Sequence, residues 1–107
     1  MANVAKRPLA LADLAEIWSF IADDSEANAD HFLAKLETKL KLLATQPRMG
    51  RERPDLLAEM RSFPYARYVV FFMAQPDGIE IVRVLHSGRD IQADDFETKG
   101  NPSATWT

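Results

Sequence analysis

Arginine is concentrated in one stretch of this chain, residues 46–90, and arginine is well suited to polar recognition. Seven of the eight arginines lie there, whereas none of the five lysines does. A guanidinium is planar and permanently charged, and it fits carboxylates, phosphates and aromatic faces that a lysine ammonium matches poorly. Any single arginine is most simply explained as a solvated surface residue. Their concentration indicates a face built for a partner. The seven are Arg48, Arg51, Arg53, Arg61, Arg67, Arg83 and Arg89.

RNA cleavage is the enzymatic chemistry that these residues could support. A metal-free ribonuclease needs one group to take the 2′-OH proton, another to protonate the leaving oxygen, and cations beside the phosphorane. A histidine can donate or accept a proton near neutral pH, which makes His86 a candidate, and Tyr65 or Tyr68 offers a hydroxyl. Side chains alternate along a strand, so Arg83 and His86 are expected on opposite faces unless a twist or bulge intervenes. His86 is better explained as a strand-end residue bonded to backbone or to a nearby carboxylate.

Metal and cofactor chemistry finds little support in the sequence. The two histidines, His31 and His86, fall on different predicted elements, and cysteine is absent, so no metal site is expected. The adjacent pairs Asp23-Asp24 and Asp94-Asp95 are typical of solvated helix ends. The four glycines are isolated and form no phosphate-binding loop. We therefore expect no cofactor.

Length and composition favour one small globular domain. A chain of 107 residues, 47% hydrophobic and 27% charged, suits a single core. The predicted domain covers residues 1–96, and residues 97–107 are predicted to form a flexible tail. The chain has no apolar run of about 20 residues, no signal-peptide core and no cysteine, which predicts a cytoplasmic protein without membrane contact. A net charge of −3 argues against general nucleic-acid binding, and no sequence-specific nucleic-acid contact is expected.

The first half of the chain predicts a helical hairpin. Residues 2–7 suit an edge strand, and Pro8 is placed to begin a helix that runs to about Asp23. Ser25 is an N-cap candidate for a second helix, which Gln46-Pro47 ends. Both helices carry apolar stripes at helical spacing, so they are expected to fold back on each other. The stripes are Leu11, Leu14, Ile17, Trp18 and Ile21 in the first helix, and Ala29, Phe32, Leu33, Leu36, Leu40 and Leu43 in the second.

The second half changes to the extended period. After an arginine loop at 47–54 and a possible single helical turn at 54–59, strands are predicted at 60–65, 67–74 and 79–85. The turn Gln75-Pro76-Asp77-Gly78 joins the last two. A final turn of helix is expected within 89–96. The fold class is therefore α+β, with the helical hairpin packed on an antiparallel sheet of three or four strands.

Three groups of residues in this half, taken in order and spacing, resemble the ParE branch of the RelE/ParE toxins. They are Gly50-Arg51; Met60-Arg61-Ser62 followed by Arg67-Tyr68; and Arg83-Val84-Leu85-His86 with Arg89-Asp90-Ile91. The resemblance covers residues from about 8 to 96. It implies the toxin of a type II toxin–antitoxin module, which poisons DNA gyrase, blocks replication and is held inactive by a ParD-like antitoxin. The fold it implies agrees with the periodicity.

The alternative within the superfamily is a RelE-like endonuclease that cuts mRNA on the ribosome. Those relatives use basic residues with a C-terminal tyrosine or histidine. Here the segment after Arg89 offers Phe96, which has no proton to give, and the lysine cluster of the nucleases is missing. Both departures favour a gyrase poison that binds its target without a catalytic residue of its own.

Two sets of contact residues follow from these expectations. The target-binding set is Arg61, Arg67, Arg83, His86 and Arg89. Within it Arg83, His86 and Arg89 are the leading candidates, whereas Arg61 and Arg67 could instead brace the sheet. A folding-on-binding antitoxin segment would bury apolar side chains in grooves beside the helical hairpin. The antitoxin-binding set is Leu14, Trp18, Leu36, Leu40 and Leu43. Arg51 and Arg53 are assigned in part to the structure of their own loop.

Overall fold

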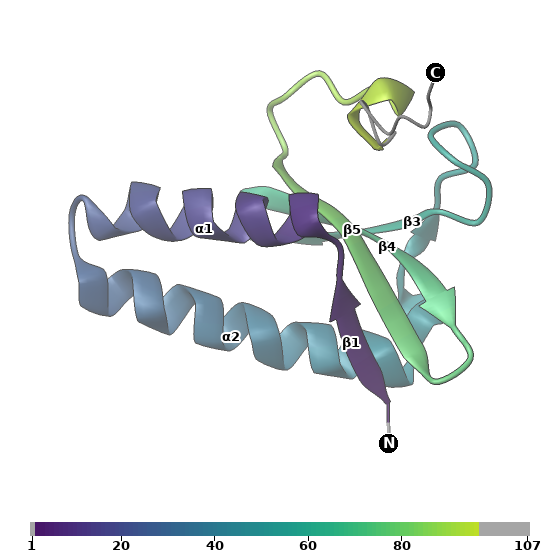
Figure 1. The fold of residues 1–107 in the computed structure, drawn as a ribbon, viewed down its shortest axis with the longest axis horizontal. Helices are drawn as coiled ribbons and strands as arrows, with labels where there is room; N and C mark the ends of the chain where they lie inside the picture. The colour runs from purple at the N-terminus through teal and green to yellow at the C-terminus, as the bar shows by residue number, and fades with distance from the viewer. Residues whose placement is uncertain (1, 97–107) are drawn as a thin grey trace.

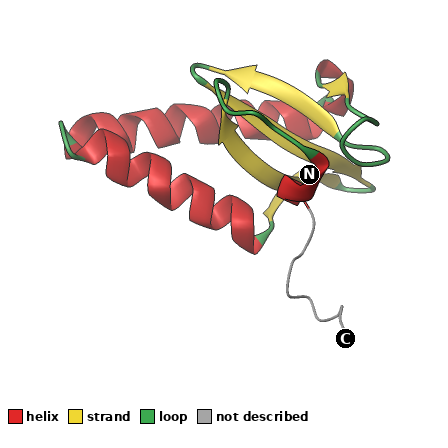
Figure 2. Ribbon diagram, turned by 90° about the horizontal axis from the view of Figure 1, so that it is seen from above, coloured by secondary structure: helices red, strands yellow, loops and turns green. Residues whose placement is uncertain are grey.

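Two helices pack side by side against one face of a five-stranded sheet in the computed structural model, which describes residues 2–96 (Figure 1). The helices are α1 (Pro8–Ala22) and α2 (Glu26–Thr45), and the strands are β1 (Asn3–Lys6), β2 (Arg51–Glu52), β3 (Arg61–Tyr65), β4 (Tyr68–Gln75) and β5 (Gly78–His86). Two short 3-10 helices, η1 (Pro47–Met49) and η2 (Ala93–Phe96), complete the described chain. The turn between α1 and α2 projects well beyond the sheet, as Figures 1 and 2 both show.

Local signals set the helix boundaries as the sequence predicts. Pro8 occupies the first turn of α1, where its missing N–H costs nothing. The Ser25 hydroxyl accepts a hydrogen bond from the Asn28 N–H at 3.1 Å and caps α2. That helix ends at Thr45, and Pro47 begins η1. These ends follow from residues within one turn of each boundary.

The α+β class is confirmed, but the sheet has five strands and is mixed. Its order is β1-β5-β4-β3-β2, and β1 pairs with β5 in parallel while the other pairs are antiparallel. The predicted edge strand is therefore present, but its parallel direction was not foreseen. Strand β2 has only two residues, so it carries no period that a sequence could reveal. Residues 54–59 form turns rather than the possible helical turn.

Gly78 allows β1 to approach β5. Its φ is +154°, and a Cβ at this position would collide with the carbonyl oxygen of Asn3, its partner in the sheet. Only glycine adopts this backbone conformation without strain. The same residue thus closes the turn after β4 and accepts the N-terminal strand.

The main core lies between the helical hairpin and the sheet. It includes Leu36, Leu40 and Leu43 of α2, whose exposed fractions are 2%, 0% and 0%. Each such leucine contributes about 1.5–3 kcal/mol by burial. The prediction that these three line an exposed antitoxin groove is therefore wrong, because their stripe faces the sheet.

A second cluster covers the opposite face of the sheet. It joins Phe71, Val82 and Leu85 to Leu56 and Met60 of the loop before β3, and to Phe96 of η2. The Phe96 ring lies edge-on to Phe71 with centroids 4.8 Å apart. Phe96 is thus a core residue that fixes η2 to the sheet.

Candidate functional site

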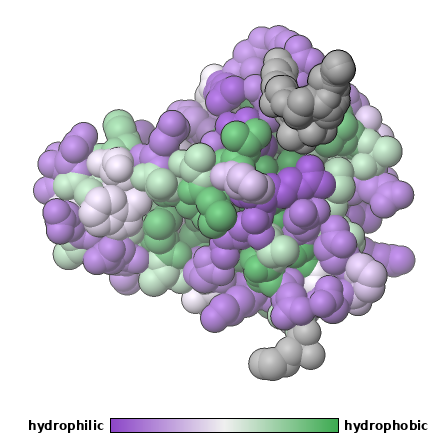
Figure 3. Space-filling view, viewed as in Figure 1, coloured by the Kyte–Doolittle hydropathy of each residue, from purple (hydrophilic) through white to green (hydrophobic). Residues whose placement is uncertain are grey.

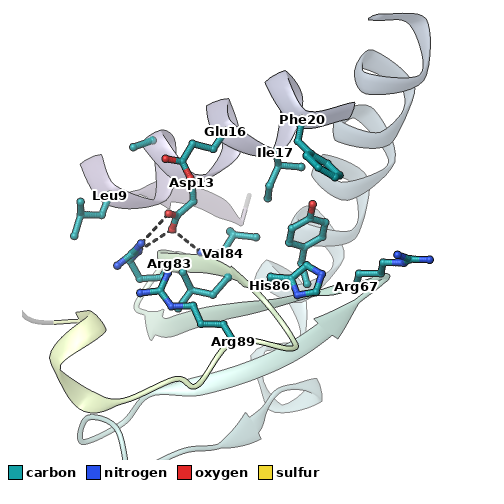
Figure 4. Close-up of a pocket in the computed structure, with 13 residues that line it drawn as sticks. Leu9, Asp13, Glu16, Ile17, Phe20, Arg67, Arg83, Val84, His86 and Arg89 are labelled. Atoms are coloured by element: carbon teal, nitrogen blue, oxygen red, sulfur yellow. Dashed lines mark hydrogen bonds and ion pairs between the residues drawn. The ribbon is translucent and has the colours of Figure 1, made fainter. Parts of the chain in front are cut away.

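A cavity of about 530 Å³ opens between α1 and the C-terminal half of β5 (Figure 4). Its walls bring together residues that are far apart in the sequence. Helix α1 contributes Leu9, Ala12, Asp13, Glu16, Ile17 and Phe20, and the sheet with its following loop contributes Arg67, Tyr68, Arg83, Val84, Leu85, His86 and Arg89. Four of the five predicted target-binding residues therefore line one cavity.

Arg83 and His86 share this cavity although a β-bulge lies before both of them on β5. Phe71 of β4 pairs with Arg83, but Phe72 pairs with Ile81, so Val82 is an extra residue on β5. A bulge of this kind breaks the two-residue alternation of side chains. The bulge precedes both residues and turns Val84 and His86 toward the helices, but side chains alternate without interruption from Arg83 to His86. Arg83 instead reaches the cavity at the edge of β5 that β1 leaves open beyond Ile81, where Asp13 of α1 also accepts from the Val84 N–H.

Arg83 is held by a buried carboxylate of α1. Its Nε and Nη2 donate to the two oxygens of Asp13 at 2.7 and 2.8 Å, and Asp13 also accepts from the Val84 N–H at 3.0 Å. The side chains of Arg83 and Asp13 are 13% and 9% exposed. The hydrogen bond to Asp13 raises the pKa of Arg83 above its ordinary value. This cation is therefore already paired.

Asp95 joins the C-terminal segment to the same cluster. Its carbonyl oxygen accepts from Nη1 of Arg83 at 2.7 Å, and its carboxylate accepts from the Arg89 guanidinium at 2.6 Å and from the Gln92 N–H at 2.8 Å. The Gln92 N–H, and next the Arg89 side chain, hold the pKa of Asp95 below its ordinary value. Two arginines of the cavity thus converge on one residue of η2.

His86 is bonded to its own turn, as the structural interpretation predicts. Its Nδ1 accepts from the Gly88 N–H at 3.0 Å, and its ring stands edge-on to Tyr68 with centroids 5.6 Å apart. The residue is nevertheless exposed at the mouth of the cavity.

The end of the cavity remote from Asp13 carries an exposed cation and an exposed ring. Figure 4 shows Arg67 extending away from Arg83, with Phe20 across the opening on α1. Phe20 is 74% exposed. Within residues 2–96, Arg67 has no ion-pair partner. This end is available for a contact.

Comparison with known proteins decides the family. The model for the ParE toxin of the type II toxin–antitoxin system, parDE, matches residues 4–91. The chain belongs to the ParE toxin family. It is 30% identical over 86 residues to Toxin ParE1 of two Mycobacterium tuberculosis strains, CDC 1551 / Oshkosh and ATCC 25618 / H37Rv, covering 78% of this chain and 88% of theirs.

The fold of this ParE toxin is similar to a solved structure described as the chromosomal ParDE TA system from P. aeruginosa. The TM-score is 0.64 at 19% identity, covering 80% of this chain and 96% of that one. The family match includes the cavity residues of α1 and β5 and ends before η2 begins. Asp95, the residue that links η2 to the cavity, therefore lies outside the matched region.

Arg61, the fifth predicted target-binding residue of the toxin, lies elsewhere. Its Nη1 donates to the Gly50 carbonyl at 2.8 Å and its Nη2 lies 3.4 Å from Glu52, so it braces β2 and the loop before it. Arg53 pairs with Asp55 inside its own loop. These two arginines serve local structure, which is the alternative that the sequence left open for both.

The remaining antitoxin candidates, Leu14 and Trp18, are half-buried on α1. The Trp18 Nε1–H donates to Asp30 of α2 at 2.8 Å, which ties the two helices together. Leu11, one turn before Leu14, is 54% exposed. In Figure 3 apolar surface gathers along the helical hairpin and where it meets the sheet.

Sequence reasoning missed Asp13. It lies seventy residues from Arg83, and nothing in the spacing connects the two. One signal was present: Asp13 falls between Ala10 and Ile17 on the buried face of α1, where an acidic side chain requires a partner. The sequence therefore indicates that Asp13 needs a partner, but it does not identify Arg83 as that partner.

Two further observations concern the part of the chain that the structure describes. Its helices are not long and apolar enough to cross a membrane. Among these residues, groups of three or more histidine, cysteine, aspartate or glutamate side chains that could hold a metal ion do not occur.

Proposed function

We propose that this ParE-family toxin inhibits DNA gyrase in the cytoplasm and so blocks replication and growth, and that a ParD-like antitoxin neutralises it by direct binding. Family membership supports the toxin role. The solved relative from P. aeruginosa is described as a ParDE system, which supports a ParD-like partner for this chain.

The state of the cavity is the observation that favours binding over catalysis. Arg83, its innermost cation, spends three donors on Asp13 and Asp95, so it is poorly placed to stabilise charge on a reacting phosphate. Arg67, His86 and Arg89 remain at the rim. A poison acts by binding one state of its target more tightly than the others, and a cationic rim beside an exposed phenylalanine provides such contacts.

A supercoiling assay with purified gyrase tests the target. We expect the wild-type toxin to inhibit the enzyme, and Arg67→Glu to raise the inhibitory concentration at least tenfold because it reverses an exposed rim charge. Arg48→Glu makes the same change at an exposed arginine of η1 outside the cavity, and it should inhibit like the wild type. Absence of inhibition by the wild-type toxin would refute gyrase as the target. Rapid mRNA cleavage in induced cells, without a DNA-damage response, would instead support an endonuclease.

Antitoxin binding is tested separately with a ParD-like chain. We propose that the segment contacts Leu11, Leu14 and Trp18, which follow one face of α1 at offsets of three and seven residues. Leu11→Asp should weaken the complex at least tenfold in a binding titration, because it places an unpaired charge in an apolar contact. Leu42→Asp, at a residue of α2 that is 41% exposed, is the matched control. Equal loss of affinity for both variants would refute the α1 face as the contact.

A further inference from the structure

A series of ion pairs and hydrogen bonds crosses three elements beside the cavity. Asp13 of α1 binds Arg83 of β5, Arg83 binds the carbonyl of Asp95 in η2, and the Asp95 carboxylate binds Arg89. Figure 4 shows the first members of this series, Asp13 and Arg83, at one end of the cavity, with Arg89 nearby. Each contact involves at least one charged group, which makes it stronger and more directional than a neutral hydrogen bond.

The geometry of Arg83 requires an arginine. One edge of its guanidinium, Nε with Nη2, is bidentate on Asp13, and the remaining nitrogen, Nη1, donates at 2.7 Å to Asp95 in another direction. A planar fork holds two acceptors at fixed angles, whereas an ammonium is a point charge on a flexible stem. A lysine at this position could still neutralise Asp13, but it would lose the second acceptor.

Asp95, which Arg83 holds in place, in turn positions Arg89. Its carboxylate binds both the Arg89 guanidinium and the Gln92 N–H, and its own N–H donates to the Gln92 carbonyl at 2.9 Å. The side chain of Asp95 is 16% exposed, whereas that of Arg89 is 46% exposed. The Asp95 carboxylate thus holds the guanidinium of Arg89, while almost half of the Arg89 side chain stays exposed at the rim of the cavity.

We propose that Asp13 and Arg83 are positioning residues of the toxin, which act by holding Asp95 so that Arg89 is presented to the target. The proposal rests on the proposed function only in taking Arg89 as a target contact. In this proposal Arg83, a leading candidate for target contact, positions other residues and does not touch the target itself. It also explains why a carboxylate stands on the buried face of α1.

The first test measures the position of the segment without any target. Arg83→Lys should increase amide hydrogen exchange at Gln92 and Asp95 at least tenfold, because the segment loses its link to β5. Exchange in the middle of α2 should not change. Glu37→Gln is the matched control, since it breaks an ion pair between α2 and Lys6 of β1 at 3.0 Å, away from the cavity. Unchanged exchange at Gln92 and Asp95 in Arg83→Lys would overturn the proposal.

The second test measures growth arrest on induction of Arg83→Lys, Arg89→Ala and the double variant. Each single variant should need at least tenfold more inducer, and the double variant should need no more than Arg89→Ala alone, because both act through one contact. Additive effects would overturn the proposal. Asp95→Asn removes the carboxylate charge and leaves Asp13–Arg83 intact, and it should show the same non-additivity with Arg89→Ala.

The two tests separate the positioning from the proposed function. Full growth arrest by Arg89→Ala would show that Arg89 is not a target contact, and the proposal that Asp13 and Arg83 present it to the target would fall with it. The exchange measurement would still decide whether Arg83 holds the segment. A wild-type toxin that arrests growth without inhibiting gyrase would refute the target alone, and the non-additivity would still decide the positioning.

Discussion

Two arginine–aspartate pairs in this toxin use the same fork chemistry in opposite surroundings. Arg53 donates from Nε and Nη2 to the two oxygens of Asp55 at 3.2 and 3.1 Å, and Arg83 donates from the same nitrogens to Asp13 at 2.7 and 2.8 Å. The Asp55 side chain is 62% exposed and that of Asp13 is 9% exposed. The partners are two residues apart in the first pair and seventy in the second.

The comparison shows that hydrogen-bond geometry alone does not set how much an ion pair contributes to the free energy of unfolding. In the exposed pair, water solvates both charges when they separate, so little stability depends on it. In the buried pair, loss of one partner leaves a charge without water, which is strongly destabilising. Only the buried pair also joins separate elements, because α1, β5 and η2 meet at Arg83.

The largest effect is expected from Asp13→Ala. Removing this carboxylate leaves Arg83 uncompensated and the Val84 N–H without its acceptor, so we expect a loss of about 3–5 kcal/mol in the free energy of unfolding. Urea unfolding at pH 7, followed by circular dichroism, measures it. A loss below about 1 kcal/mol would place this pair in the same class as exposed ones.

A smaller effect is expected from acid. The pKa of Asp95 is lowered in the fold, so its contribution to stability is complete above the unfolded value and is lost as the pH falls through the folded value. The free energy of unfolding should therefore fall below about pH 4. Asp95→Asn should flatten this fall, in urea titrations from pH 7 to pH 3. Equal slopes for the two proteins would contradict a lowered pKa in the fold.

The smallest effect is expected from Asp55→Ala. The Arg53 guanidinium also lies over the Phe71 ring, 5.9 Å from the centroid, and this contact should hold Arg53 in place when its exposed partner is removed. The urea midpoint should match that of the wild type within error, because water solvates the exposed charges in low salt and salt screens them further in 1 M NaCl. A shift comparable to that of Asp13→Ala would abolish the distinction between the two regions.

The features that could be predicted are those that depend on near neighbours in the chain. Pro8, Ser25 and Pro47 set helix ends through groups within one turn, and Gly78 closes the turn between β4 and β5. The apolar stripes of α1 and α2 predicted a helical hairpin on a sheet. The direction in which the α2 stripe faces was not predictable, because a stripe is the same whether a sheet or a partner covers it. Leu36, Leu40 and Leu43 were therefore assigned to the wrong surface.

The cavity depended on features with no local signal. The bulge at Val82 exists because of the pairing of β5 with β4, and it reverses the facing of every residue after it. The partner of Asp13 is determined by the packing of α1 on the sheet. The arginines that could be listed from the sequence could not be sorted into Arg53 and Arg61, which brace loops, and Arg67 and Arg89, which reach the cavity.

The amino-acid sequence was sufficient to predict the helical hairpin, the main strands and the likeness to ParE toxins, and it contains the arginine-rich stretch at residues 46–90. Each of these rests on periodicity, turn chemistry or residue spacing, which are properties of short segments. Contacts between distant segments set the parallel direction of the edge strand, the bulge, and the burial of Arg83 against Asp13. The physical reason is that a charge is paired or free according to which distant residue packs against it, and packing belongs to the whole fold.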